Sequence, residues 1–270
     1  MVMKKQDVAI FFDQCAPWWD ADMIRNEEVI TKILDHANIE PNVHVLDVAC
    51  GTGVLFPDYL GRNVASVTGI DISPNMVKIA SVKFPQVHVI CGDVEEVDFN
   101  RMFDRVMVYN AFPHFPDPQR LIQILATLVH PGGRLSIAHG MSRAVLADHH
   151  AGRASTVSID LIHEEALASI LSPWFDVDVM ISDDQMYQVC GTRNDTPAER
   201  PREYPLSESL AMLKFMITHN DTHSQELADL AGELKAAGEL KAYRQIMEAV
   251  AEFDVANTRL RSVLDDLSER

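Results

Sequence analysis

Short apolar runs alternate with helical segments across the middle of the chain. The run from Val43 to Val48 predicts a buried strand that leads into a helix at about residues 53–61. Further strands are predicted at Ser66–Asp71, Val87–Gly92, Phe103–Asn110, Arg134–His139, Phe175–Ile181 and Met186–Cys190, with further helices beginning near residues 74, 118 and 161. Strands and helices that alternate at this spacing are typical of β-α units and a parallel sheet. The pattern therefore predicts an α/β fold.

The two ends of the chain follow other patterns. Residues 4–38 predict two helical pieces that contain the aromatic-rich stretch Phe11–Asp20. Residues 192–205 are polar and proline-rich without apolar periodicity, which indicates a linker. We therefore expect one domain over residues 1–191 and a separate helical region over residues 206–270.

The helical region predicts a hairpin or coiled coil, because its apolar residues recur at alternating spacings of three and four. Gly238 marks the expected turn. The expected seam holds Leu227, Leu230, Leu234, Ile246, Val250, Phe253, Asn257, Leu260, Leu264 and Leu267. A single polar residue in such a seam is typical where register matters more than stability. We expect the hairpin to pack on the first domain or to form a homodimer with a second copy.

Composition and charge narrow the classes of protein. The chain has 270 residues, 47% of them hydrophobic, and can bury a substantial core. Its net charge of −17, without a visible basic cluster, disfavours DNA or RNA as a partner, since nucleic-acid binders concentrate Lys and Arg. No segment predicts a membrane span, and the N-terminus lacks the apolar core of a signal peptide. We expect a cytoplasmic protein.

The four cysteines are scattered at Cys15, Cys50, Cys91 and Cys190, without a C-x-x-C pair. This spacing disfavours both a disulfide framework and a zinc knuckle. We expect ordinary buried thiols.

A glycine turn follows the first predicted strand. Gly51 and Gly53 remove side chains where the backbone bends, so that a ligand can lie against main-chain N–H groups at the start of a helix. A dinucleotide fingerprint requires a third small residue, and Phe56 occupies that position, although the acid Asp71 lies twenty residues after Gly51. The turn favours a different nucleotide-like ligand.

The stretch Asp47 to Gly53 resembles motif I of the class I S-adenosylmethionine (SAM)-dependent methyltransferases. Asp71 at the end of the second strand, Asp93-Val94 after the third and the turn His130-Pro-Gly-Gly133 are similar to that family at matching spacings. The resemblance covers about residues 10–192 and is nearest to the quinone-biosynthesis-like, small-molecule branch. It implies a Rossmann-like, mostly parallel seven-stranded sheet of order 3-2-1-4-5-7-6, with the last strand antiparallel. The C-terminal helical hairpin is an addition to this fold.

The resemblance also implies the residues that bind SAM. Asp71 would hold the ribose hydroxyls, with a cap for the helix at residue 74 as its alternative role. Ile72 and Met76 would flank the adenine, and Asp93 would accept its amino hydrogens. The implied set is Asp47, Ala49, Cys50, Gly51, Gly53, Asp71, Ile72, Met76, Gly92, Asp93, Val94, Asn110 and Ala111. The aromatic N-terminal stretch resembles a lid over the cofactor; its alternative is simple packing on the sheet.

Methyl transfer from a sulfonium needs mainly alignment and exclusion of water, and it needs a base only if the acceptor loses a proton. After the fourth strand the chain has Asn110-Ala-Phe-Pro in place of Asn-Pro-Pro-Tyr, the pattern that resembles enzymes that methylate amino groups. It also lacks a Pro-Cys nucleophile of the kind that cytosine carbon methyltransferases use. These features favour a small-molecule acceptor with an oxygen, nitrogen, sulfur or carbon nucleophile. The alternative function is a non-catalytic SAM- or metal-sensing interaction protein that works through its helical region.

Histidines are the candidate catalytic and metal-binding residues. His114, His139 and His150 come from three stretches that could converge near the transferred methyl, although each alone is also typical of a surface or hydrogen-bonded histidine. His219 and His223 are four residues apart on a predicted helix and could share a metal ion. The alternative for this pair is two solvated histidines.

Overall fold

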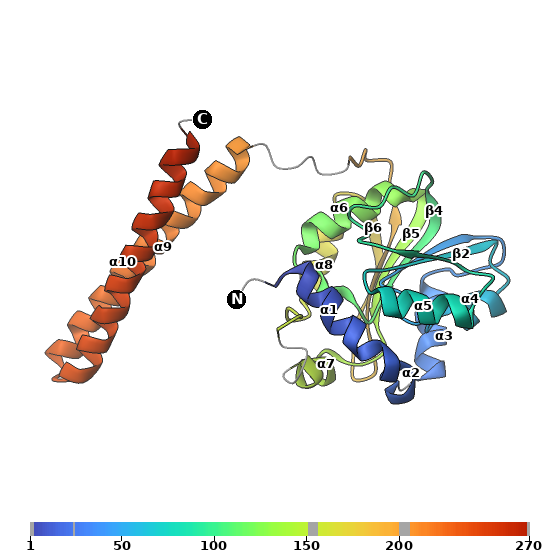
Figure 1. Ribbon diagram of the computed structural model, residues 1–270, viewed down its shortest axis with the longest axis horizontal. Helices are drawn as coiled ribbons and strands as arrows, with labels where there is room; N and C mark the ends of the chain where they lie inside the picture. Colours follow the sequence, from blue (N-terminus) through green and yellow to red (C-terminus); the bar gives the residue numbers. More distant parts are fainter. Residues whose placement is uncertain (1–2, 24, 151–155, 200–205, 269–270) are drawn as a thin grey trace. The chain divides into compact units, whose positions relative to one another are not determined.

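The computed structural model describes residues 3–23, 25–150, 156–199 and 206–268. The chain divides into two compact units, Met1–Arg200 and Pro201–Arg270. The first unit is an α/β domain, and the second is a pair of long helices (Figure 1). The α/β class predicted from the apolar pattern is confirmed.

One seven-stranded sheet forms the centre of the first unit. Its order is β3-β2-β1-β4-β5-β7-β6, and only β7 runs antiparallel to its neighbours among the described strands. The strands are β1 His44–Val48, β2 Ser66–Asp71, β3 His88–Cys91, β4 Phe103–Tyr109, β5 Val129–His139, β6 Phe175–Ser182 and β7 Tyr187–Arg193. This order confirms the topology that the resemblance implied.

Helices cover both faces of the sheet. They are α1 Lys5–Cys15, η1 Ala16–Trp18, α2 Trp19–Asp22, α3 Glu27–His36, α4 Phe56–Gly61, α5 Pro74–Lys83, η2 Phe112–His114, α6 Pro118–Leu128, α7 Arg143–His150 and α8 Glu164–Leu171. Residues of α3, α4 and α5 share one buried apolar cluster with Val45, whereas residues of α6 and α8 share another with Leu46 and Val48. Because both faces are covered, the strands read as continuous apolar runs.

Side chains at the start of three helices supply the acceptors that free backbone N–H groups need. Ser73 accepts from the N–H of Met76 at 3.2 Å ahead of Pro74, and Asp117 and Asn26 cap α6 and α3 in the same way. The helix start predicted at Ser73-Pro74 is confirmed.

The first unit continues beyond the boundary expected at residue 191. Strand β7 extends to Arg193, whose guanidinium donates to the carbonyls of Ala126 and Trp174, both at 3.1 Å. The N–H of Asn194 donates to the Trp174 carbonyl at 3.0 Å. The polar composition that predicted a linker from residue 192 therefore includes groups that bond to the domain.

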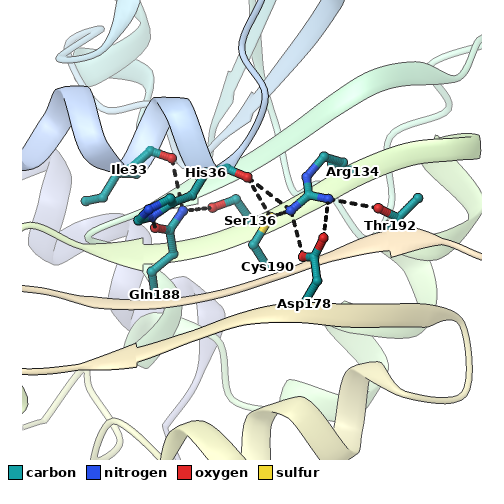
Figure 2. A network of polar contacts seen from close by, with 8 residues as sticks. All are labelled: Ile33, His36, Arg134, Ser136, Asp178, Gln188, Cys190 and Thr192. Carbon is teal, nitrogen blue, oxygen red and sulfur yellow. Dashed lines mark hydrogen bonds and ion pairs between the residues drawn. The ribbon is translucent and has the colours of Figure 1, made fainter.

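A buried cation fastens the antiparallel end of the sheet (Figure 2). The guanidinium of Arg134 donates to both carboxylate oxygens of Asp178 at 2.7 and 2.8 Å, to Thr192 Oγ1 at 2.8 Å and to the carbonyl of His36 at 3.0 Å. These bonds join β5, β6, β7 and α3. The hydrogen bond from Arg134 lowers the pKa of Asp178, and burial raises the pKa of the neighbouring Cys190 thiol to about 11.

A buried amide continues the same network. Gln188 Nε2 donates to the Ile33 carbonyl at 3.0 Å and to Ser136 Oγ at 2.9 Å, and its Oε1 lies 2.8 Å from His36 Nδ1 (Figure 2). Helix α3 is thus held to the sheet by polar as well as apolar contacts.

The second unit consists of α9 Leu206–Ala236 and α10 Leu240–Ser268, joined at Gly238 with φ +90°. The predicted turn is confirmed. The predicted seam is wrong at Leu230 and Phe253, whose exposed fractions are 46% and 45%. Among the α9 side chains that the structure describes, the buried ones are instead Ile217, Ser224 and Ala231, seven residues apart, so Leu230 lies beside the seam.

None of the described helices combines the length and the apolar content that crossing a bilayer requires.

Replacing Arg134 with Met is expected to destabilise the first unit by about 2 kcal/mol, the range for hydrogen bonds to a charged group. All three tryptophans, Trp18, Trp19 and Trp174, lie in this unit, so urea unfolding followed by tryptophan fluorescence measures its stability. Lys32→Met, which breaks only the exposed ion pair with Glu28, is the control and should change stability by less than about 0.5 kcal/mol.

The difference between wild type and Arg134→Met should also depend on pH. Arg134 holds the pKa of folded Asp178 below its ordinary 3.8, so the pair stabilises the fold above that pH and stops doing so as pH falls through the lowered folded value. The stability difference should therefore narrow below about pH 3.8. A constant difference down to acid unfolding would contradict this account.

Candidate functional site

A pocket lies at the carboxyl ends of the central strands of the first unit. Its walls come from the turn after β1, the ends of β2, β3 and β4, helix η2 and the N-terminal segment before α3. Strands β1 and β4 are neighbours at the point where the strand order reverses. Open α/β sheets bind ligands in the crevice at such a point.

The turn after β1 is fixed by a buried carboxylate. Ala49 and Gly51 both adopt φ +54°, and the N–H of Gly51 donates to Asp71 Oδ2 at 2.8 Å. Asp71 Oδ1 accepts from the N–H of Ser73, also at 2.8 Å. Burial raises the pKa of Asp71, and these two N–H groups oppose that rise. Each oxygen can accept a further hydrogen bond, because a carboxylate oxygen has two lone pairs.

Two residues expected to bind the ligand do not line the pocket. Gly53 has φ +84°, and a Cβ there would lie 2.6 Å from the Phe56 ring. Gly53 therefore makes room for Phe56, not for a ligand.

Asp47 is the second such residue. Because side chains alternate along β1, Asp47 points to the same face of the sheet as Val45, whereas Val48 points to the other face and lines the pocket. Burial, and then the nearby Asp71 carboxylate, raise the pKa of Asp47 well above its usual range.

The other eleven residues expected to bind the cofactor do line this pocket. They are Ala49, Cys50, Gly51, Asp71, Ile72, Met76, Gly92, Asp93, Val94, Asn110 and Ala111. Residues from four separate turns are thus brought to one cavity, as the order of the strands requires.

The N-terminal segment covers the pocket through charged links. Lys5 Nζ lies 2.7 Å from Asp93 Oδ2 and 2.8 Å from Glu95 Oε2. At the next contact along the segment, Asp13 Oδ1 accepts from Ser73 Oγ at 2.9 Å and from the N–H of Asn75 at 2.8 Å. Helix α1 is therefore held both to the acids that follow β3, Asp93 and Glu95, and to the start of α5.

The end of this segment contacts the glycine turn itself. Asp20 accepts from Thr52 Oγ1 at 2.5 Å and pairs with Lys83 at 2.7 Å. Arg25 donates to the carbonyl of Val54 and lies 2.9 Å from Asp58 Oδ2. Trp19 Nε1 lies 3.7 Å from the position of a Cβ at Gly51.

Aromatic rings of the N-terminal segment and of η2 line the pocket. The Phe12 ring lies edge-on to Trp19, with centroids 5.6 Å apart, and to His114, with centroids 4.7 Å apart. Trp18 is 68% exposed, so only one of the two adjacent tryptophans faces the pocket. Of the two sequence interpretations, the contacts favour a cover over the pocket.

Sequence reasoning missed several residues of this lining, namely Lys5, Val8, Met23, Arg25, Tyr109 and Phe115. Burial raises the pKa of Tyr109 to about 12, so its hydroxyl stays protonated at neutral pH. No local sequence pattern identifies Lys5 as a pocket residue, because its partner Asp93 lies 88 residues away in the chain.

His114 is the one candidate catalytic histidine found in the described pocket lining. Its Nδ1 lies 2.8 Å from the carbonyl of Val157 and 3.2 Å from Ser158 Oγ. A carbonyl only accepts hydrogen bonds, so Nδ1 carries the ring proton in the neutral form. Nε2 is then the nitrogen that can take up a proton.

The expected convergence of the three histidines fails at His139. His139 is fully buried outside the pocket lining, with its ring edge-on to Tyr187 at 6.1 Å, because β5 and β7 pair these two residues. The side chain of His150 lies outside the described residues.

The proposed metal pair stays a prediction. The side chain of His219 lies outside the described residues, and His223 Nδ1 lies 2.9 Å from Glu226 Oε2. Within the described ranges, His163, Glu164 and Glu165 are the three side chains whose ligand atoms lie within 4.8 Å of one another. Arg143 lies 2.9 Å from His163 Nδ1, and a cation at that position disfavours a metal ion.

Comparison with known families matches the two units separately. The family described as a methyltransferase domain matches residues 46–137, which hold the glycine turn and strands β2 to β4. A domain of unknown function (DUF8180) matches residues 210–267, within the helical hairpin.

Individual relatives cover part of the chain. The ubiquinone biosynthesis O-methyltransferase of Coxiella burnetii is 32% identical over 141 residues, which are 48% of this chain and 60% of that protein. The chain thus spans about three fifths of the length of this curated relative.

Two solved structures are similar in fold. The DhpI complex with S-adenosylhomocysteine (SAH) has a TM-score of 0.55 and 18% identity, and it covers 71% of this chain and 97% of its own. The N-methyltransferase NodS of Bradyrhizobium japonicum WM9 in complex with SAH has a TM-score of 0.54 and 15% identity, with coverage of 70% and 97%.

Replacing Gly53 with Ala should destabilise the first unit more than the same change at Gly132. Both glycines have positive φ, which costs an L-residue about 1 kcal/mol. A Cβ at Gly132 meets nothing within 4 Å, whereas at Gly53 it meets the Phe56 ring. We expect Gly53→Ala to cost about 2 kcal/mol more in urea unfolding, the range for overpacking a core. Equal losses would contradict the structural role assigned to Gly53.

Proposed function

We propose that the protein, which matches the methyltransferase-domain family over residues 46–137, transfers a methyl group from SAM to a small-molecule acceptor by in-line displacement. The observation that carries this proposal is the pocket built around Asp71 and Gly51 at the carboxyl ends of β1 and β2. The relative from Coxiella burnetii, named an O-methyltransferase, supports it.

The pocket offers a complementary group for each part of SAM. The Asp71 carboxylate can accept the two ribose hydroxyls, and Ile72 and Met76 offer apolar surface to the adenine. Asp93, which is already paired with Lys5, can accept a hydrogen bond from the amino group of adenine.

The amino-acid tail of SAM would lie along the turn at residues 49–51. Arg25 and Trp19 line that part of the cavity and offer N–H donors to the carboxylate of the tail.

The reaction needs little chemistry from the protein. As the acceptor attacks, the bond between the methyl carbon and the sulfur breaks, and its electron pair returns to sulfur to give neutral SAH. The new bond joins the methyl carbon to the acceptor atom. The contribution of the chain is alignment and a cover that excludes water, for which Phe12 and Trp19 are placed.

The aromatic wall suits an apolar, planar acceptor. A hydroxyl acceptor must lose its proton during attack, and we assign this role to His114, which lies in the pocket lining. A phenol or catechol is therefore the acceptor class to test first.

Asp71→Asn should weaken binding of SAM and of SAH by roughly 10- to 100-fold, as expected when a hydrogen bond to a charged group is lost. Isothermal titration calorimetry measures this directly. Asp98→Asn, at an exposed position outside the described pocket lining, is the control and should bind as wild type does. If the wild-type protein bound neither SAM nor SAH, the proposed function would be wrong.

His114→Ala should lower kcat with a catechol acceptor by roughly 10²-fold, the usual contribution of a general base, and leave the affinity for SAM unchanged. The exposed His130, replaced by Ala, is the control. Unchanged turnover in His114→Ala would remove this residue from the mechanism.

A further inference from the structure

The helical hairpin has a narrow interior that its own two helices fill. On α9 the buried residues Ile217, Ser224 and Ala231 repeat every seven residues, and on α10 Val250 and Asn257 do the same. These are the a positions of two heptads written a to g, in which positions e and g lie on opposite sides of the seam. The hairpin therefore has an e flank and a g flank.

The e flank is closed by polar contacts. Asp221 of α9 and Arg261 of α10, both at e, form an ion pair across the two helices. Beside them, Asn257 Nδ2 donates to Asp221 Oδ1, and Asn220 Nδ2 donates to Asn257 Oδ1, both at 2.9 Å. This contact shows that the e positions of the two helices share one side, so the g positions share the other.

The g flank is exposed and is apolar along α10, whereas on α9 it holds His223 between Met216 and Leu230. From Ala242 to Leu267 on α10, each residue at alternating spacings of four and three is apolar. We define the apolar flank as Met216 and Leu230 of α9 with Ala249, Phe253, Ala256 and Val263 of α10. All six are exposed, and the four large ones have exposed fractions of 45–53%.

The pattern of the apolar flank identifies its occupant. On α10 the g positions 242, 249 and 256 are all alanine, whereas the adjoining d positions are large, as at Phe253. Two copies of α10 laid antiparallel across this flank would place Phe253 of one copy against Ala249 and Ala256 of the other. A surface that alternates small and large residues is in this way complementary to itself about a two-fold axis.

The size of the hairpin face that holds the apolar flank agrees with such a pairing. From Ala242 to Leu267 this face is about 38 Å long, and two helices side by side are about 20 Å wide. The face is therefore on the order of 750 Å² per copy, close to the roughly 800 Å² per partner of a specific interface, and the apolar flank occupies part of it.

We propose that the apolar flank docks a second copy of this chain, so that two hairpins form a four-helix layer that joins two methyltransferase domains. The proposal stands on the heptad positions and the exposed residues alone and does not depend on the proposed methyl transfer. The role of the hairpin, which the family of unknown function matches as a separate module, would then be dimerisation.

Light scattering on the full chain at tens of micromolar tests the proposal. Wild type should show about twice the chain mass of 30.2 kDa. Phe253→Asp and Leu230→Asp should each show the mass of one chain. Val255→Asp is the matched control: Val255 is 54% exposed, on the same helix two residues from Phe253, but outside the g flank, so this variant should remain dimeric.

Circular dichroism and calorimetric binding of SAH should be unchanged in the monomeric variants, which separates loss of pairing from loss of folding. A wild-type chain that stays at 30.2 kDa over the concentration series would overturn the proposal, whatever else covers the apolar flank. Dissociation by Val255→Asp to the same extent as by Phe253→Asp would overturn the assignment of the flank.

Discussion

The carboxylate of Asp71 joins the three segments that create the pocket. Asp71 is the last residue of β2. Its carboxylate oxygens accept hydrogen bonds from the N–H of Gly51 after β1 and from the N–H of Ser73 before α5. Burial raises its pKa, while the two N–H groups favour the ionised form that the turn requires. In the proposed complex this same group meets the ribose, so the geometry of the turn and the recognition of the ligand depend on one anion.

The N-terminal segment covers this anion through pairs of charged groups as well as through the rings of Phe12 and Trp19. Lys5 reaches Asp93 and Glu95, and Asp20 joins Thr52 to Lys83. Hydrogen-bonded ion pairs fix direction as well as distance. A segment held in this way has a defined closed position over the pocket.

The sequence predicted what depends on local chemistry. The glycine turn, the cap at Ser73 and the order of the strands through the family resemblance all agree with the structure. Prediction from the sequence failed where the role of a residue depends on the direction of its side chain or on a partner that is distant in the chain. Gly53 serves the Phe56 ring, and His139 faces the interior. Lys5 meets an acid 88 residues away, which no local pattern records.

The two units bury apolar surface in different ways. The sheet closes two large apolar clusters, one on each face, whereas the hairpin places Ser224 and Asn257 at interior positions and leaves Phe253 exposed. Polar residues in a seam fix register at a cost in stability. In the proposed dimer, association stabilises the folded hairpin by mass action, so its stability rises with protein concentration. The Asn257 contacts then set the alignment of α9 with α10 within one chain, and apolar contact between chains supplies the burial that one hairpin lacks.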